Sequence, residues 1–177
     1  GLEDLAPQSP YAATKLAEEE FVRTLVREKG LRAISFRFGT IFGTSPGMRF
    51  HTAVNKFCWQ AVMGTPVTVW RTALDQKRPY LDLSDAVEAV VHFVRSDLFD
   101  GRVYNVLTAN ATVRNIVDEI RLNVPELQVE FVDAEIMNQL SYEVSSERVS
   151  ETGFVARGSL ADGVRNTIDL LKRANGA

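Results

Sequence analysis

The sequence is short of the residues that form disulfides and metal centres. Its 177 residues include one cysteine, Cys58, and two histidines, His51 and His92. A single cysteine cannot form a disulfide within the chain, which is typical of proteins in a reducing cytoplasm. Cys58 lies in an apolar stretch, which favours a core residue over a nucleophile. The two histidines lie far apart and lack the spacing of metal ligands, so we expect no metal site.

Long apolar runs and an excess of positive charge are also missing. No run approaches the about 18 apolar residues that a membrane-spanning helix needs, so we expect no membrane span or membrane partner. No basic segment followed by an apolar stretch stands at the start, so we expect no signal peptide. The formal net charge of −3 argues against nucleic acid as a partner. With 45% hydrophobic residues, the chain can form the core of one compact unit.

Helical and strand patterns alternate along the chain, which indicates an α/β fold. Four residues are suited to cap the starts of helices and two glycines to end them: Ser9, Ser84, Thr112, Ser159, Gly30 and Gly64. The expected helices span 10–29, 50–63, 85–95, 113–122 and 160–173. The expected strands span 33–38, 67–70, 79–83, 103–106 and 129–132. Residues 39–43 predict a turn and 71–77 a loop, while the charged segment 134–150 fits more than one structure.

Tyr11 and Lys15 form the most informative pair of the chain. Ser9 is a good helix cap and Pro10 suits the first helical position, so a helix should begin here. On that helix Tyr11 and Lys15 lie one turn apart on one face. A nearby ammonium stabilises a phenolate, and such a phenol can pass a proton to or from a substrate hydroxyl or carbonyl. The alternative interpretation is a surface pair on an ordinary helix.

Four segments, in order along the chain, carry a resemblance to a known family. They are Pro7–Lys15, Phe36–Gly43, Arg78–Val87 and Val103–Val106. In order and spacing they resemble the motifs Pro-x-Ser-x-Tyr-x-x-x-Lys, Arg-x-x-x-x-Tyr-Gly, Arg-Asp-x-x-x-Val-x-Asp and Tyr-Asn-Val. These motifs belong to the extended short-chain dehydrogenase/reductase family, the NAD(P)-dependent nucleotide-sugar epimerases and dehydratases.

The resemblance implies an α/β fold with the C-terminal part of a Rossmann-like doubly wound sheet plus a smaller α/β substrate-binding domain. Residues 1–43 would end the dinucleotide-binding domain, with the catalytic helix and the strand that follows it. Residues 44–177 would be mainly the substrate-binding domain. Within them, residues 79–95 would return to the cofactor domain.

A Gly-rich turn, with which the family begins its Rossmann half, is missing. The sequence contains no Gly-x-x-Gly-x-x-Gly. The Ser or Thr that the family pairs with its tyrosine would also lie before residue 1. We therefore expect this chain to correspond to the C-terminal half of an enzyme that is a homodimer at full length, and to be inactive alone. With one face of its sheet uncovered, it would oligomerise, meet the missing half in trans, or be marginally stable.

The resemblance assigns the catalytic and cofactor-binding residues. Tyr11 would be the general acid/base, and Lys15 would contact the ribose hydroxyls of the nicotinamide nucleotide. The backbone at Phe38 and Gly39 would pass close to the nicotinamide, where a glycine permits close approach. The family often has Asn where Thr40 stands. The cofactor would be NAD or NADP, because the residue that distinguishes them follows the second strand of the missing half.

The resemblance also assigns residues that bind a nucleotide-sugar substrate. Arg78 would contact the substrate diphosphate, since a guanidinium fork suits phosphate oxygens. Asn55 would hydrogen-bond the substrate near its phosphates, and Arg49 would be a second phosphate contact. Trp70 would stack or pack on the base.

Three of these assignments have a structural alternative. Arg78 could form a salt bridge to Asp75 or Asp82, Asn55 could be a helix-surface amide, and Trp70 could be a core residue. Asp85 is expected to cap its helix. Two further residues match family positions but could tie strands and loops together: Arg37 and Asn105.

Three functions remain open at this point. The first is an NAD(P)-dependent epimerase or dehydratase that acts on a nucleotide-activated sugar. The second is a reductase of the same fold that acts on a small carbonyl or alcohol without a nucleotide. The third is a non-catalytic chain that binds a nucleotide sugar or a partner through an exposed half-sheet. The phosphate contacts expected from Arg78, Asn55 and Arg49 favour the first over the second.

Overall fold

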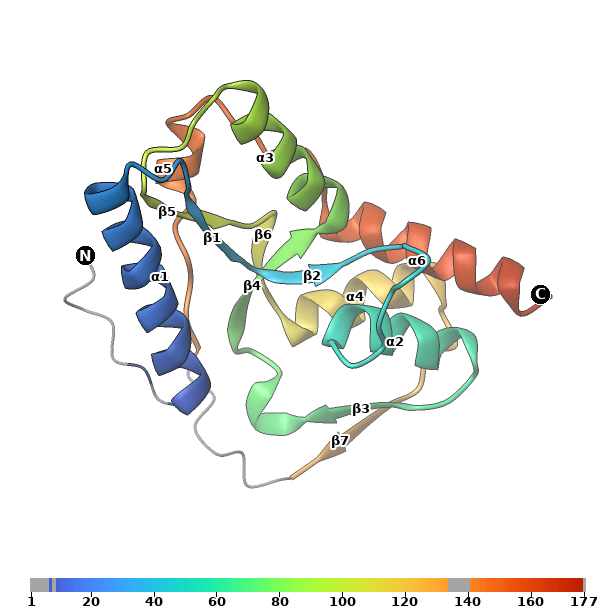
Figure 1. Ribbon diagram of the computed structural model, residues 1–177. Helices are drawn as coiled ribbons and strands as arrows, with labels where there is room; N and C mark the ends of the chain where they lie inside the picture. Colours follow the sequence, from blue (N-terminus) through green and yellow to red (C-terminus); the bar gives the residue numbers. More distant parts are fainter. Residues whose placement is uncertain (1–6, 8, 134–140, 177) are drawn as a thin grey trace.

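The computed structural model describes residues 7, 9–133 and 141–176, which form a mixed α/β structure (Figure 1). The helices are α1 (Pro10–Lys29), α2 (Ala53–Val62), α3 (Leu83–Arg95), α4 (Val113–Asn123), α5 (Glu147–Ser150) and α6 (Leu160–Ala174), with a 3-10 turn η2 (Arg71–Ala73). The strands are β1 (Ser35–Phe38), β2 (Thr40–Phe42), β3 (Val67–Trp70), β4 (Lys77–Asp82), β5 (Val103–Val106), β6 (Ala109–Thr112) and β7 (Val129–Val132). The α/β fold is confirmed, and the domain boundary expected near residue 43 stays a prediction.

Within the described residues, the strands form three small sheets. Strand β1 pairs in parallel with β5, and β3 pairs in parallel with β7. Strand β2 lies parallel to β4, whose other edge pairs antiparallel with β6. The sequence pattern did not predict β6. Of the segment 134–150, residues 134–140 lie outside the described residues, and its last four residues form α5.

The prediction of a turn at residues 39–43 is wrong, because most of this segment forms strand β2. Gly39 donates its N–H to the carbonyl of Val106 at 2.9 Å, and Thr40–Phe42 then pair with β4. The chain thereby passes directly from one sheet to the next. A Cβ at Gly39 would lie 3.1 Å from the carbonyl carbon and oxygen of Pro79, so glycine permits the close approach of the two backbones.

Most helix ends lie where the sequence predicts them. The side chains of Ser9, Thr112 and Ser159 accept backbone N–H groups in the first turns of α1, α4 and α6. Thr112 also forms a reciprocal capping box with Asn115. Gly30 ends α1 at φ 66°, a left-handed conformation that favours glycine.

Helix α3 begins differently from expectation. Its cap is Asp82 and not Ser84, because the Asp82 carboxylate accepts the N–H of Ser84 at 2.8 Å. Asp85 does not cap the helix either. It is buried, and it accepts the N–H groups of residues 157–158 at 2.8 and 3.1 Å and the hydroxyl of Thr108 at 2.5 Å. Its role is structural, as expected, because it holds two loops against α3.

Among the described residues, buried side chains form two hydrophobic clusters. One lies between the strands and helices α2, α4 and α6, and it contains Tyr80 and the fully buried Cys58. The other lies beneath α3 and contains Leu81 and Phe93. Adjacent residues of a strand point to opposite faces, so β4 contributes to both clusters. The prediction that Cys58 is a core residue is confirmed.

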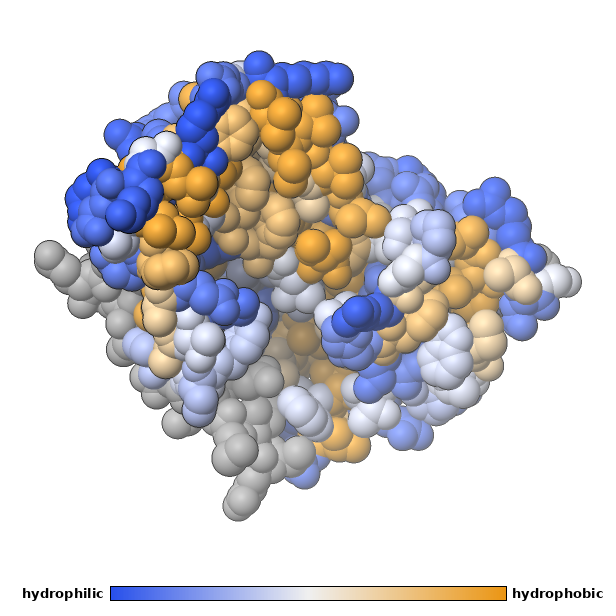
Figure 2. All heavy atoms as spheres, in the orientation of Figure 1, coloured by the Kyte–Doolittle hydropathy of each residue, from blue (hydrophilic) through white to orange (hydrophobic). Residues whose placement is uncertain are grey.

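One face of the molecule carries apolar side chains that nothing in the described structure covers. Val87, Val90 and Val94 recur about one turn apart on α3 and are exposed, as are Phe38 and Ile41 on the neighbouring strands. Figure 2 shows hydrophobic side chains gathered over α3 and the region beside it. Among the described strands, β1 pairs only with β5, so its second edge is open. A further part of an α/β sheet would cover such a face.

Candidate active site

The first turn of α1 presents Tyr11 and Lys15 to solvent. The Tyr11 side chain is 73% exposed, and the Lys15 ammonium lies 5.7 Å from the centre of its ring. Glu18 accepts a hydrogen bond of 2.7 Å from Lys15 and raises the pKa of that ammonium, with a smaller contribution from Tyr11. Lys15 therefore keeps its positive charge beside the phenol, and both groups can be reached by a ligand.

A two-point ion pair fixes α1 against the sheet. The guanidinium of Arg37 on β1 donates to both carboxylate oxygens of Glu19, at 2.7 and 2.5 Å. The Glu19 side chain is only 13% exposed, and its hydrogen bonds raise the pKa of Arg37. The sequence did not single out Glu19. Its spacing of four residues from Lys15, on the same helix face, is the signal that could have found it.

Helix α1 runs antiparallel to β1, so the first turn of α1, with Tyr11 and Lys15, points in the direction in which β1 ends (Figure 1). Phe38, the last residue of β1, is exposed, and Gly39 is half-buried. Open α/β sheets bind ligands at the carboxyl ends of their strands. Phe38 and Gly39 lie at this end of β1, and the contact of Tyr11, Lys15, Phe38 and Gly39 with NAD(P) stays a prediction.

A cleft of about 440 Å³ lies beside β2 and the start of α2. Its lining includes Gly39, Arg49 and Asn55. Asn55 is 4% exposed, so the alternative of a helix-surface amide is wrong. The Asn55 amide accepts the N–H of Gly43 and donates to the carbonyl of Arg49, both at 3.2 Å. It thereby shapes the loop that closes the cleft.

Arg78 and Trp70 lie outside the lining of this cleft. Arg78 is half-buried on β4, with its guanidinium 4.9 Å from the ring centre of Tyr142. Asp75 is one of the acids considered for a salt bridge to Arg78. Its carboxylate accepts two hydrogen bonds from Arg114, at 2.7 and 3.0 Å. Trp70 is 43% exposed on β3, so its alternative as a core residue is wrong.

Asn105, like Arg37, ties neighbouring segments together. Its side-chain amide on β5 donates to the carbonyl of Ser145 at 3.1 Å. In the part of the chain that the structure describes, no three metal-ligating side chains group together. No helix there combines the length and apolar character needed to cross a bilayer.

Curated proteins similar to this chain are sugar-nucleotide enzymes. A trifunctional UDP-glucose 4,6-dehydratase/UDP-4-keto-6-deoxy-D-glucose 3,5-epimerase/UDP-4-keto-L-rhamnose-reductase of Arabidopsis thaliana is 27% identical over 173 residues, covering 93% of this chain and 25% of that protein. The dTDP-D-glucose 4,6-dehydratase of Bos taurus is 24% identical over 172 residues, covering 92% of this chain and 47% of that protein. The chain thus spans at most about half the length of these relatives.

Solved structures share the fold. The UDP-glucose 4-epimerase of Thermus thermophilus in complex with NAD superposes with a TM-score of 0.82 at 25% identity, over 96% of this chain and 56% of that one. The UDP-glucose 4-epimerase of Thermotoga maritima with UDP-glucose gives a TM-score of 0.85 at 19% identity, over 96% and 55%. These likenesses confirm the Rossmann-like α/β class expected from the sequence.

A family comparison covers the candidate site itself. The model of the NAD dependent epimerase/dehydratase family matches residues 1–106. That range is more than half of the chain and includes the Tyr11 and Lys15 pair, strands β1 to β5 and the cleft beside β2. The chain therefore belongs to the NAD dependent epimerase/dehydratase family.

Proposed function

We propose that this chain is the substrate-side part of an enzyme that acts on a nucleotide-activated sugar by NAD(P)-dependent epimerase or dehydratase chemistry. The observation that carries the proposal is the exposed Tyr11 and Lys15 pair in the first turns of α1. The similar proteins named above support the substrate class, since their names specify UDP- or dTDP-sugars.

Tyr11 is proposed as the general acid/base. When bound, NAD(P) supplies the acceptor for a hydride that leaves a sugar carbon. Tyr11 takes the proton of the hydroxyl on that carbon, and the Lys15 charge 5.7 Å from its ring stabilises the phenolate. Both side chains also offer hydrogen-bond donors that suit the hydroxyls of a ribose. The residues present therefore fit the nicotinamide end of the cofactor.

The pyrophosphate of the cofactor finds no matching motif in this chain. Dinucleotide sites hold it at a Gly-rich turn and helix N-terminus, and this sequence has no such turn. We propose that a Gly-rich half completes the site by covering the apolar face of α3 and the open edge of β1. The chain by itself should then bind NAD(P) weakly in calorimetric titration. A micromolar dissociation constant for the chain alone would contradict this part of the proposal.

Arg78, Arg49, Asn55 and Trp70 are proposed to bind the nucleotide sugar. Arg78 contacts the diphosphate, Arg49 and Asn55 act from the cleft beside β2, and the exposed Trp70 ring packs on the base. Loss of Arg78 to alanine should weaken nucleotide-sugar binding by about 1.5–3 kcal/mol, the range for hydrogen bonds to charged groups. Cofactor affinity should stay unchanged.

A lysine at the Arg78 position should recover only part of the lost binding, because a point charge cannot reproduce a two-pronged contact. Calorimetry with UDP- and dTDP-sugars measures both substitutions. An unchanged affinity together with a lowered melting temperature would assign Arg78 a purely structural role.

The decisive experiment is Tyr11→Phe in the enzyme with a complete cofactor domain. Loss of a general acid/base should lower turnover by about 100-fold or more, with little change in substrate binding. Tyr104→Phe is the matched control, because it also removes a phenol hydroxyl. That hydroxyl donates to Asp100 at 2.7 Å and takes no part in the proposed site. Turnover of Tyr11→Phe within a few-fold of wild type would remove Tyr11 from the mechanism.

A further inference from the structure

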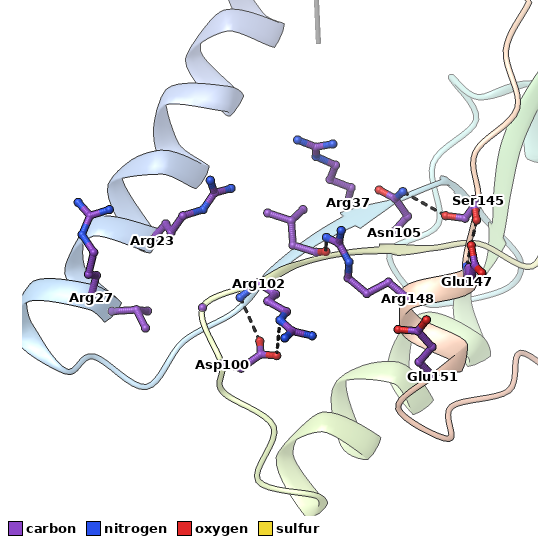
Figure 3. Close-up of a pocket in the computed structure, with 13 residues that line it drawn as sticks. Arg23, Arg27, Arg37, Asp100, Arg102, Asn105, Ser145, Glu147, Arg148 and Glu151 are labelled. Carbon is purple, nitrogen blue, oxygen red and sulfur yellow. Dashed lines mark hydrogen bonds and ion pairs between the residues drawn. The ribbon is translucent and has the colours of Figure 1, made fainter. Parts of the chain in front are cut away.

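A second cleft lies at the opposite end of α1 from Tyr11 and Lys15. It has a volume of about 1090 Å³ and is bounded by the C-terminal half of α1, the start of β5, and α5 (Figure 3). Its α1 wall carries Arg23 and Arg27. At 1.5 Å per residue these lie about 18 and 24 Å along the helix from Tyr11. The α1 wall of the cleft therefore lies away from Tyr11, and the cleft floor includes Arg37 of β1 and Asn105 of β5.

Five arginines line this cleft: Arg23, Arg27, Arg37, Arg102 and Arg148. Figure 3 shows Arg23 and Arg27 reaching from α1 on one side, with Arg102 and Arg148 on the other. Only three carboxylates share the lining, although the whole chain has a net charge of −3. The lining thus carries more cationic than anionic side chains, although Glu19, Glu20 and Glu28 pair with three of the arginines from outside it.

Two of the five arginines are held by the fold. The charge of Arg37 is taken up by Glu19, as described above. Arg148 donates to the carbonyl of Val103 at 2.8 Å. Among the residues that the structure describes, no carboxylate lies within 4.0 Å of the Arg148 guanidinium. The carbonyl therefore fixes this side chain at the cleft without neutralising its charge.

The other three arginines form weak ion pairs with acids close in sequence. The N–O distances are 3.2, 3.3 and 3.4 Å for Arg23–Glu20, Arg27–Glu28 and Arg102–Asp100. Such solvent-exposed pairs contribute little to stability. A ligand anion can replace these acids at small cost, because each arginine only exchanges one oxygen partner for another.

We propose that this cleft binds an oligophosphate, a ligand with at least two adjacent phosphate groups, through Arg23, Arg27, Arg102 and Arg148. Guanidinium groups match phosphate oxygens in pairs. The four arginines stand on two opposite walls, so a ligand with several phosphates engages both. The carboxylate of Glu151 on the α5 side of the lining opposes the bound anion.

Calorimetric titration of the chain with sodium pyrophosphate and with inorganic phosphate, at low and constant ionic strength, tests the proposal. Pyrophosphate should bind about tenfold more tightly than phosphate, since it offers two groups to two walls. Arg148→Gln and Arg27→Gln should each weaken pyrophosphate binding by about tenfold, the effect of a lost charge-assisted contact. Glu151→Gln should tighten it. Arg27 is exposed, so its variant keeps the test valid if Arg148→Gln unfolds.

Arg121→Gln is the matched control, because Arg121 on α4 is a half-exposed arginine paired with Asp118 at 3.6 Å and lies outside the cleft. Unchanged binding in this variant supports the proposal, and a loss equal to that of Arg27→Gln overturns it as a general charge effect. Equal affinity for phosphate and pyrophosphate, or no loss in either cleft variant, also overturns it. Titration with UDP distinguishes the source of the phosphates. If UDP binds more tightly than pyrophosphate and this binding is lost in Arg148→Gln, the ligand is a nucleoside diphosphate. If UDP binds more weakly than pyrophosphate, the ligand is a free oligophosphate.

Discussion

Replacement of Gly163 by alanine tests how closely α6 packs against β2. Gly163 is buried in α6, and a Cβ built there would overlap the ring of Phe42 and lie 3.2 Å from a carboxylate oxygen of Asp82. Phe42 is 1% exposed and packs edge-on against Tyr80, with ring centres 6.5 Å apart. The Phe42 ring therefore has little room to move away from an added methyl group.

Two effects of opposite sign determine the result. In an exposed helix, a change from glycine to alanine gains about 1 kcal/mol of stability. Overpacking a filled core costs about 1–3 kcal/mol, and the overlap with a buried aromatic ring places Gly163→Ala at the upper end of that range. We expect the free energy of unfolding to fall by about 1–2 kcal/mol, which lowers the melting temperature of a chain of this size by about 2–8 °C.

Urea unfolding followed by circular dichroism measures this difference. Asn166→Ala is the control, because Asn166 is exposed in the same helix and its change should stabilise slightly through helix propensity alone. A smaller side chain in Phe42→Leu should restore part of the stability of Gly163→Ala in a double-mutant cycle. If Gly163→Ala is as stable as wild type or more stable, the contact between α6 and β2 is looser than described.

Three further experiments test the interior. Asp85→Ala should lower the free energy of unfolding by about 3 kcal/mol, because it leaves the N–H groups of residues 157–158 without their acceptor, and Asp85→Asn should cost less in the same urea titration. Cys58 should react with a thiol reagent only after unfolding, since burial raises its pKa to about 12; fast reaction in the native state would contradict its burial. Arg37→Met should cost about 2–4 kcal/mol, because Glu19 then lacks its partner; an unchanged melting temperature would show that the ion pair is dispensable.

The helices could be predicted from the sequence because their signals are local. Ser9, Pro10 and Gly30 mark the ends of α1, and Thr112 marks the start of α4. Strands β2 and β6 could not be predicted, because each forms through pairing with β4, which lies many residues away in sequence. A tripeptide or tetrapeptide strand carries too little periodicity to reveal such a partner.

The candidate site divides in the same way. The spacing of Tyr11 and Lys15 is sufficient to place them on one helix face, and the structure has them there. The burial of Asn55 and the role of Asp85 depend on loops that fold against them from elsewhere in the chain. The arginine-lined cleft brings together residues from 23 to 151, a juxtaposition that no short motif records.

The position of β4 between the two hydrophobic clusters has a consequence for how the molecule comes apart. Tyr80 and Leu81 are consecutive residues, yet each is anchored in a different cluster. Loosening either cluster removes one face of the support for the same strand, so neither can melt and leave β4 intact. Local opening should therefore be confined to segments such as the ends of α1 and α6, and the amide hydrogens of β4 should exchange only when the whole molecule unfolds.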